Sequence, residues 1–263
     1  MPALANSARF LLKSLADFVF PPICYGCDSE VESGLVCEAC RLDLFTHELA
    51  VCSVCGRPCT PSTNRCGQCA TPFSLSRVRA LGLYVPPFDK LIQAFKYSGK
   101  TRVGELLGQA LAALVRQDEV LSAADEVCPI PLHPARMRER GITQSLLQAA
   151  AISMSTGIPL ADCLVRRRNT STQTMKTSPE ARQKNLAGAF RPRPDAGVDG
   201  KTVLLVDDVM TTGATLDQAA QALLKGGATN VLGVVIAAAH AGGPPSRPSE
   251  NRVPARTAAC TPV

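Results

Sequence analysis

The stretch Val203-Leu-Leu-Val-Asp-Asp-Val-Met-Thr-Thr-Gly-Ala-Thr215 decides the fold. Its first four residues are apolar and aliphatic, which is typical of a strand that is buried on both faces of a parallel sheet. Two adjacent carboxylates end this strand, a short loop of hydroxyl residues and glycine follows, and a helix is expected from near Ala214. Ligands of open parallel sheets bind beyond the carboxyl ends of the strands. The stretch therefore predicts an α/β fold with a binding site in this loop.

The residue types in the loop predict the kind of ligand. Free backbone N–H groups at a helix start attract phosphate. Hydroxyl donors and a glycine that allows close approach of the backbone lie in the same loop: Thr211, Thr212, Gly213 and Thr215. Asp207 and Asp208 would repel a phosphate unless they bind sugar hydroxyls or a magnesium ion on the same ligand. A ribose that carries a phosphate satisfies both halves. The alternative is an unrelated strand–turn–helix in which the acids form a solvated cap.

This stretch resembles the phosphoribosyl-diphosphate signature of type I phosphoribosyltransferases. In that family the paired acids contact the ribose hydroxyls, and a Thr-Thr-Gly-x-Thr loop holds the 5-phosphate. The resemblance implies these roles for Asp207 and Asp208 and for the loop residues Thr211, Thr212, Gly213 and Thr215. It also implies phosphoribosyl diphosphate as the ligand, accompanied by Mg²⁺.

Alternating helices and strands are expected on both sides of this stretch, across residues 78–240. The apolar runs predict strands at Glu126–Ile130, Val203–Val206 and Val231–Ile236. Helical spacing predicts helices at Leu91–Phe95, Val103–Arg116, Ser145–Ser155 and Ala214–Leu224, the last stopped by Gly226-Gly227. Strand–helix–strand order predicts right-handed crossovers and a parallel sheet with helices on both faces.

Cysteines dominate residues 21–72: nine of the twelve in the chain lie between Cys24 and Cys69. Eight of them form four CxxC pairs: Cys24, Cys27, Cys37, Cys40, Cys52, Cys55, Cys66 and Cys69. Two residues between thiolates let a tight turn present both sulfurs to one tetrahedral zinc ion. The two nearly equal blocks predict a double zinc ribbon with structural Zn²⁺, because four thiolates leave no open coordination position. Sequential and interleaved pairing both remain open, Cys59 is a competing ligand, and iron–sulfur or redox chemistry is the alternative.

The two ends of the chain carry less information. Residues 1–20 predict a short amphipathic helix that docks on its own protein rather than on a membrane surface, and Pro21-Pro22 stops it. Lys13 and Asp17 interrupt its apolar face, so it reads neither as a signal peptide nor as a transmembrane segment, and a reducing cytoplasmic setting is expected. Residues 241–263 are rich in Pro, Arg and Ala and predict a disordered tail.

A wider resemblance runs from about Phe18 to Val235 and is to the ComF-like proteins, which are linked to natural competence. They combine a double zinc ribbon with a phosphoribosyltransferase domain. Three further segments carry the resemblance: Phe95–Gly99, Pro129–Gly141 and Arg166–Phe190. It implies that they supply diphosphate or lid contacts, with these candidates: Lys96, Arg136, Arg138, Arg140, Gln144, Gln173 and Arg182. The sequence departs from the family at Ile142 and Thr143, where an aromatic residue and Asn are common.

Three functions are compatible with these features. The family resemblance favours a protein that binds phosphoribosyl diphosphate with magnesium and acts in DNA uptake, with single-stranded DNA and competence proteins as partners and a homo-oligomer as a further option. The net charge of +6 is compatible with phosphate-rich partners. The first alternative is a true phosphoribosyltransferase with an unidentified acceptor and no assigned catalytic residue. The second is a zinc-dependent scaffold.

Overall fold

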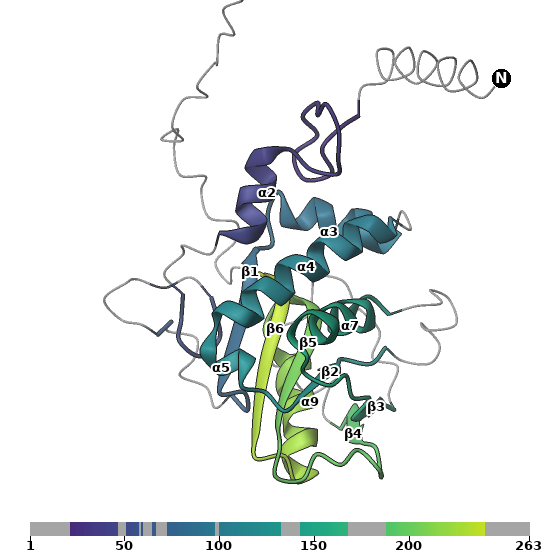
Figure 1. Ribbon diagram of the computed structural model, residues 1–263. Helices are drawn as coiled ribbons and strands as arrows, with labels where there is room; N and C mark the ends of the chain where they lie inside the picture. The colour runs from purple at the N-terminus through teal and green to yellow at the C-terminus, as the bar shows by residue number, and fades with distance from the viewer. Residues whose placement is uncertain are drawn as a thin grey trace, which may run out of the picture.

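A four-stranded parallel sheet forms the centre of the protein, in the order β1-β6-β5-β2 (Figure 1). The computed structural model describes residues 22–46, 51–57, 59, 65–66, 73–97, 100–132, 143–167 and 188–239. The strands are β1 (Arg77–Leu83), β2 (Glu126–Pro129), β5 (Thr202–Met210) and β6 (Asn230–Ala238), and each neighbouring pair is parallel. The predicted parallel sheet and its three predicted strands are therefore confirmed, whereas β1 is a strand that was not predicted. The helix expected at residues 1–20 and the tail at 241–263 lie outside the described residues.

Strand β5 runs further than its apolar run suggests. Residues Val203–Val206 are fully buried, as expected of a central strand. The pairing with β6 continues beyond Asp207 to Met210, which lies opposite Ala238. The prediction that the strand ends at the acids was wrong, because a partner strand of equal length extends the ladder. The two acids lie inside the last part of the strand, and the loop begins at Thr211.

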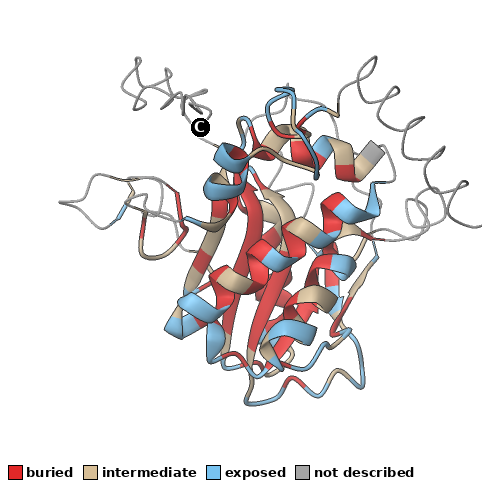
Figure 2. Ribbon diagram, turned by 45° about the horizontal axis from the view of Figure 1, so that its top comes forward, coloured by how far each residue is buried: buried red, intermediate tan, exposed pale blue. Residues whose placement is uncertain are grey.

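Helices cover one face of the sheet (Figure 2). They are α3 (Phe88–Tyr97), α4 (Thr101–Gln117), α5 (Glu119–Ser122) and α7 (Gln144–Thr156). Their apolar side chains form one buried cluster with the side chains of Leu204, Val206 and Leu232. The helices predicted at Leu91–Phe95, Val103–Arg116 and Ser145–Ser155 are thus present, each slightly longer than its apolar pattern.

The other face carries helix α9 (Ala214–Lys225) and a short antiparallel hairpin, β3 (Leu164–Arg166) with β4 (Phe190–Pro192). These elements enclose a second buried cluster with Val203, Leu205 and Val235. Helix α9 begins at Ala214 as predicted and is capped at its C-terminal end by Gly226, with Gly227 at φ 102°. The hairpin was not predicted, because three-residue strands show no periodicity.

The first cysteine block lies against the helical layer. Its helix α2 (Glu38–Phe45) places Leu44 in the buried cluster of that layer. Asp28 forms an ion pair with Lys90 of α3, and the Lys100 ammonium lies 5.4 Å from the centroid of the Tyr25 ring. The block is therefore attached to the domain by both apolar and charged contacts.

The second cysteine block lies along strand β1 at the edge of the sheet. The Val78 backbone N–H donates to the Val54 carbonyl, with a distance of 2.5 Å between nitrogen and oxygen. A side chain on Gly56 would meet the Val78 carbonyl oxygen at 2.6 Å, so this approach requires glycine. Within the described parts of the chain, no helix has both the length and the apolar character needed to cross a membrane.

Candidate functional site

The two acids of β5 each have a cationic neighbour. Alternation along the strand places Leu204 and Val206 in one apolar cluster and Val203 and Leu205 in the other. This alternation does not continue past the acids, because Val209 packs against the cluster of Leu204 and Met210 lies in the cluster of Val203. Cations from both layers lie near the acids: Lys96 at the end of α3 forms an ion pair with Asp208, and Lys96 and Arg166 of β3 both oppose the raised pKa of Asp207.

The ion pair between Lys96 and Asp208 brings a predicted candidate into the site. Lys96 belongs to the segment that the family resemblance assigns to the diphosphate side of the ligand, and it is separated from Asp208 by more than one hundred residues. Both side chains are about four-fifths buried, with exposed fractions of 19% and 23%. The Coulomb attraction within such a largely buried ion pair is stronger than that between the same charges in open solvent. Lys96 therefore supplies the positive charge beside Asp208 that a bound cation could otherwise supply.

Asp207 lies in a setting that disfavours its charge. Burial and the neighbouring Asp208 carboxylate raise the pKa of Asp207 to about 7, against the opposing effects of the Asp208 N–H, Lys96 and Arg166. The Asp208 N–H donates to the Asp207 carboxylate at 2.9 Å. A site that holds two adjacent carboxylates in this way is poised to bind hydroxyl groups or a cation, because either would relieve the repulsion.

The raised pKa of Asp207 predicts a pH dependence of stability. Between its unfolded pKa of about 3.8 and its folded pKa of about 7, the folded protein binds more protons than the unfolded chain, so stability falls as pH rises through this window. Asp207→Asn removes this loss. The free energy of unfolding of the variant minus that of the wild type should therefore be larger at pH 8 than at pH 6, by about 1 kcal/mol. Urea unfolding in magnesium-free buffer measures this, and a gain that is equal at the two pH values would contradict it.

The loop after β5 has the features of a phosphate site. Gly213 has φ 85°, and helix α9 begins there without a side-chain cap. The Thr212 hydroxyl accepts from the Ala214 N–H at 3.3 Å, which fixes the turn into the helix. A side chain on Gly213 would also lie 3.1 Å from the Phe73 ring. Thr211 is exposed, and Thr212 and Thr215 are partly exposed. The uncapped helix start and these hydroxyls offer donors to an anion.

The first cysteine block brings four thiols together. The sulfur atoms of Cys24, Cys27, Cys37 and Cys40 all lie within 4.8 Å of one another. Backbone N–H groups of Gly26 and Cys37 donate to the Cys24 sulfur at 3.3 Å and 3.2 Å. Hydrogen bonds from Ser29 lower the pKa of Cys27 to about 6, whereas burial raises that of Cys40, an effect that a bound cation reverses. The block fits one tetrahedral zinc ion.

The second block shows the same arrangement for three thiols. The sulfur atoms of Cys52, Cys55 and Cys66 lie within 4.8 Å of one another, and Cys59 is not part of this group. Cys69 lies outside the described residues, so its role as the fourth ligand stays a prediction. The grouping within each block favours sequential pairing, with one zinc ion per block, over interleaved pairing.

Two family models match the chain. A phosphoribosyl transferase domain matches residues 142–258, and a double zinc ribbon domain matches residues 15–70. The DNA utilization protein YhgH of Escherichia coli is 32% identical over 218 residues, which cover 80% of this chain and 94% of that protein. The chain belongs to the ComF family. Competence protein F of Haemophilus influenzae is 28% identical and covers 80% of this chain and 87% of its own length. Competence protein ComFC of Bacillus subtilis is 27% identical, with 78% and 90% covered.

The other predicted site residues of this ComF-family chain are placed in part. Gln144 is the first residue of α7, whose next residue Ser145 donates to the Ile130 carbonyl at 2.7 Å, beside the carboxyl end of β2. Five candidates lie outside the described residues: Arg136, Arg138 and Arg140, with Gln173 and Arg182 of the expected lid. The two ends of that lid segment are described, and they pair with each other through Arg166 and Phe190.

Two residues near the acids were not singled out as site candidates. Arg166 stands in the sequence only as the first residue of the segment Arg166–Phe190, and its position near Asp207 depends on the unpredicted hairpin. Arg57 of the second zinc block donates to the Thr211 carbonyl at 2.8 Å. Arg57 is one of two arginines between the CxxC pairs of this block, and nothing in the sequence signals such a contact. Both residues reach the site through tertiary packing alone.

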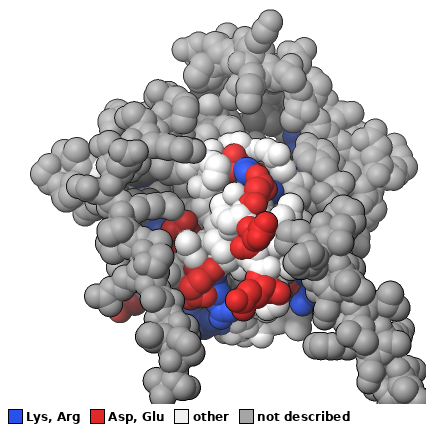
Figure 3. Space-filling model, turned by 90° about the horizontal axis from the view of Figure 1, so that it is seen from above, with Lys and Arg blue, Asp and Glu red and all other residues white. Residues whose placement is uncertain are grey.

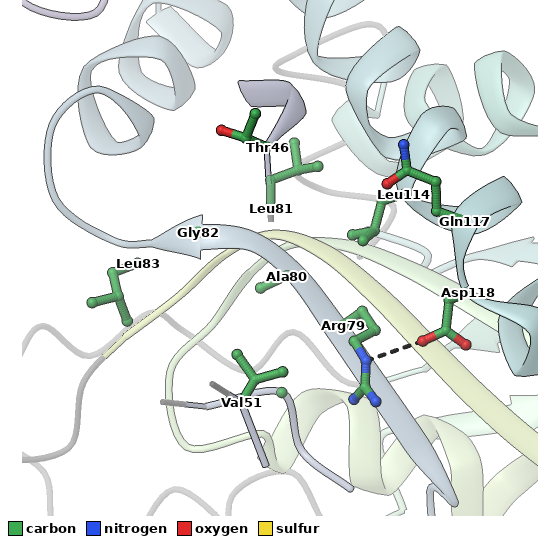
Figure 4. A pocket seen from close by; sticks show the side chains of 11 residues that line it. Thr46, Val51, Arg79, Ala80, Leu81, Gly82, Leu83, Leu114, Gln117 and Asp118 are labelled. Atoms are coloured by element: carbon green, nitrogen blue, oxygen red, sulfur yellow. Dashed lines mark hydrogen bonds and ion pairs between the residues drawn. The ribbon is translucent and has the colours of Figure 1, made fainter. Parts of the chain in front are cut away.

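A cavity of about 260 Å³ lies elsewhere, along the outer side of β1 (Figure 4). Its lining is largely apolar and includes Leu81 and Val51. Its charged side chains Arg79 and Asp118 neutralise each other at 3.1 Å. The cavity is two strands away from the acids of β5. It offers no set of converging polar groups, so the ComF-family signature loop, and not this cavity, is the candidate site.

Proposed function

We propose that this ComF-family protein binds phosphoribosyl diphosphate together with Mg²⁺ in the β5–α9 loop and acts in DNA uptake. The observation that carries the proposal is the position of two adjacent carboxylates, Asp207 and Asp208, shortly before the start of helix α9, whose N-cap residue Gly213 provides no side-chain cap. Acids suit ribose hydroxyls, and the helix start suits a phosphate. A sugar phosphate supplies both groups at once.

The residues present also fit a magnesium ion. Mg²⁺ is held by one or two carboxylates together with substrate phosphates, and it retains several waters. Asp207 and Asp208 offer those carboxylates, and Asp208 already forms an ion pair with a cation, the Lys96 ammonium. When bound, the metal would neutralise charge on the diphosphate of the ligand. The Asp207 carboxyl would then lose the proton that its raised pKa favours near neutral pH.

Lys96 has a second role in this proposal. In the ligand-free protein it neutralises Asp208, and a bound magnesium ion would compete for the same carboxylate. The released ammonium would then face the phosphates of the ligand, as the family resemblance implies. Lys96→Met should therefore weaken phosphoribosyl diphosphate binding about tenfold, which corresponds to the loss of one hydrogen bond to a charged group. Calorimetric titration measures this.

Lys90→Met is the matched control for that variant. Lys90 lies on the same helix and is also ion-paired, but with Asp28 of the first zinc block. Its removal takes away the same charge and should leave ligand affinity unchanged. Equal affinities of the Lys96 and Lys90 variants would mean that Lys96 serves only as a partner of Asp208.

The link to DNA rests on the relatives, whose names refer to DNA utilization and to competence. The charges of the two zinc blocks differ. Residues 22–46 carry five acidic residues and one basic residue, whereas residues 51–70 carry two arginines and no acid. Acidic side chains are prominent on the end of the molecule shown in Figure 3. A DNA strand held through its phosphates would therefore follow the second block and the basic segments around Arg136 and Arg166, and would avoid the first block.

The deciding experiment is calorimetric titration of the zinc-loaded protein with phosphoribosyl diphosphate and magnesium, with and without single-stranded DNA. Saturable binding that requires magnesium supports the site. A change in affinity with DNA present, which weakens steeply with salt, supports the role in DNA handling. Release of diphosphate would favour the phosphoribosyltransferase alternative, which is supported by the match to the phosphoribosyl transferase domain. Absence of binding would favour a zinc-dependent scaffold.

A further inference from the structure

We infer that Arg57 of the second zinc block is a positioning residue for the phosphate loop, so that zinc bound in this block sets the affinity of a loop 154 residues further along the chain. The inference rests on the proposed ligand for its functional consequence. The coupling itself is a property of the ligand-free protein and stands on the contacts of Arg57.

The backbone at Arg57 is held by the turn that carries the thiols. The Cys52 N–H donates to the Arg57 carbonyl at 2.7 Å, and the Gly56 N–H donates to the Cys52 carbonyl at 3.1 Å. These two bonds close the turn between Cys52 and Arg57. Zinc bound by Cys52, Cys55 and Cys66 would hold the same turn, because Cys52 and Cys55 lie within it.

The same turn is fixed to the sheet. Arg79 of β1 donates through Nη1 to the carbonyls of Cys52 and Ser53, each at 3.3 Å, and Val78 donates to Val54 at 2.5 Å. Arg79 is itself held by Asp118 at 3.1 Å. The turn therefore has a defined position relative to β5 and its loop, and so has the backbone of Arg57, from which the side chain extends.

The Arg57 side chain spans the remaining distance to the loop. It is 8% exposed, and its Nη2 donates to the Thr211 carbonyl at 2.8 Å. Thr211 is the first residue after β5, where the chain leaves the sheet ladder. A buried guanidinium is costly unless its donors are used, and the Arg57 Nε has no partner within the described residues. The hydrogen bond to the Thr211 carbonyl is therefore an important contact of Arg57, and its loss should increase the mobility of the loop.

The physical consequence concerns loop order. Thr211 and Thr212 connect the strand to a glycine at φ 85°, and such a short polar segment samples many conformations unless it is anchored. The Arg57 bond anchors its first carbonyl from one side. A loop that is ordered before binding loses less entropy when the ligand arrives and binds it more tightly. Arg57 also adds a positive charge next to a site that already holds two carboxylates.

The test compares Arg57→Ala with Arg65→Ala, which removes the same charge from an exposed position beside Cys66 in the same block. Hydrogen exchange of the backbone amides at residues 211–216 is measured on ligand-free protein, together with zinc content. Arg57→Ala should retain two zinc ions per chain, exchange faster in the loop, and bind phosphoribosyl diphosphate about tenfold more weakly. Arg65→Ala should match the wild type in all three.

Two further variants complete the test. Arg57→Lys, which retains one donor, should restore part of the protection and decides the question if the alanine variant does not fold. Cys52→Ser should lose one zinc ion and speed exchange in the same loop, whereas Cys24→Ser should lose one zinc ion and leave the loop protected. Loop exchange equal to the wild type in both Arg57 variants would overturn the inference. Failure of the wild type to bind the ligand would instead count against the proposed function, and loop exchange would still decide this inference.

Discussion

Replacing both Asp207 and Asp208 with asparagine should abolish binding of phosphoribosyl diphosphate, with a loss of at least about 100-fold in affinity, while the fold stays intact. Asparagine keeps the size of the side chain but cannot carry the charge that a magnesium ion requires. Each carboxylate also accepts hydrogen bonds more strongly than an amide oxygen does. Calorimetric titration with magnesium measures the loss, and circular dichroism with thermal unfolding reports the fold.

Asp125→Asn is the control for this variant. Asp125 is exposed at the opposite end of the sheet, where its carboxylate accepts from the Thr202 N–H at 2.8 Å. Its replacement should leave ligand affinity as in the wild type. Unfolding of the variant that lacks both Asp207 and Asp208 would mean that these acids hold the strand together. The raised pKa of Asp207 argues for the opposite outcome, since a group that destabilises the fold when charged is retained for another purpose.

Cys24→Ser should reduce the zinc content from two ions per chain to one and unfold the first block. Structural zinc in small ribbons contributes about 10–16 kcal/mol to their folding, and a block of this size has little apolar core of its own. The Cys24 sulfur accepts two backbone hydrogen bonds that a serine oxygen would replace poorly. Elemental analysis measures the zinc, and limited proteolysis near Cys27 and Cys37 reports the unfolding.

Cys59→Ser is the matched control for that loss. Cys59 lies in the second block and is not part of the group formed by Cys52, Cys55 and Cys66. The serine variant should keep both zinc ions. A loss of one ion would show that Cys59 is a zinc ligand and that the ligands of the second block are not the four cysteines of its CxxC pairs. Unchanged zinc in Cys24→Ser would contradict the four-thiolate site itself.

The centre of the fold could be predicted because it is encoded locally. The buried run Val203–Val206, the loop glycine and the start of α9 follow each other in one short stretch, and each has its own physical signal. The four CxxC pairs are equally local. The choice between sequential and interleaved pairing needed the structure, which groups the four thiols of the first block and three of the second.

The remaining parts depend on contacts between distant segments. Strand β1 alternates Arg77 and Arg79 with apolar residues, and its burial makes sense only because both guanidinium groups share Asp118 at 3.0 Å and 3.1 Å. The ion pair of Lys96 with Asp208 and the bond from Arg57 to Thr211 likewise join segments far apart in the chain. No periodicity or motif signals such pairs. The extension of β5 to Met210 came from the length of its partner strand.

The position of the second zinc block on β1 has a consequence for handling the protein. An uncovered edge strand presents unpaired backbone groups that can join a strand from another molecule. Here the Val54 carbonyl accepts a hydrogen bond from the Val78 N–H of β1. At the opposite edge of the sheet, residues 159–161 pair with Val127 of β2. Chelation of zinc would release the second zinc block from β1 and leave the backbone groups of this edge strand unpaired. Strong chelators during purification should therefore cause precipitation through edge-to-edge self-association, and added zinc should suppress it.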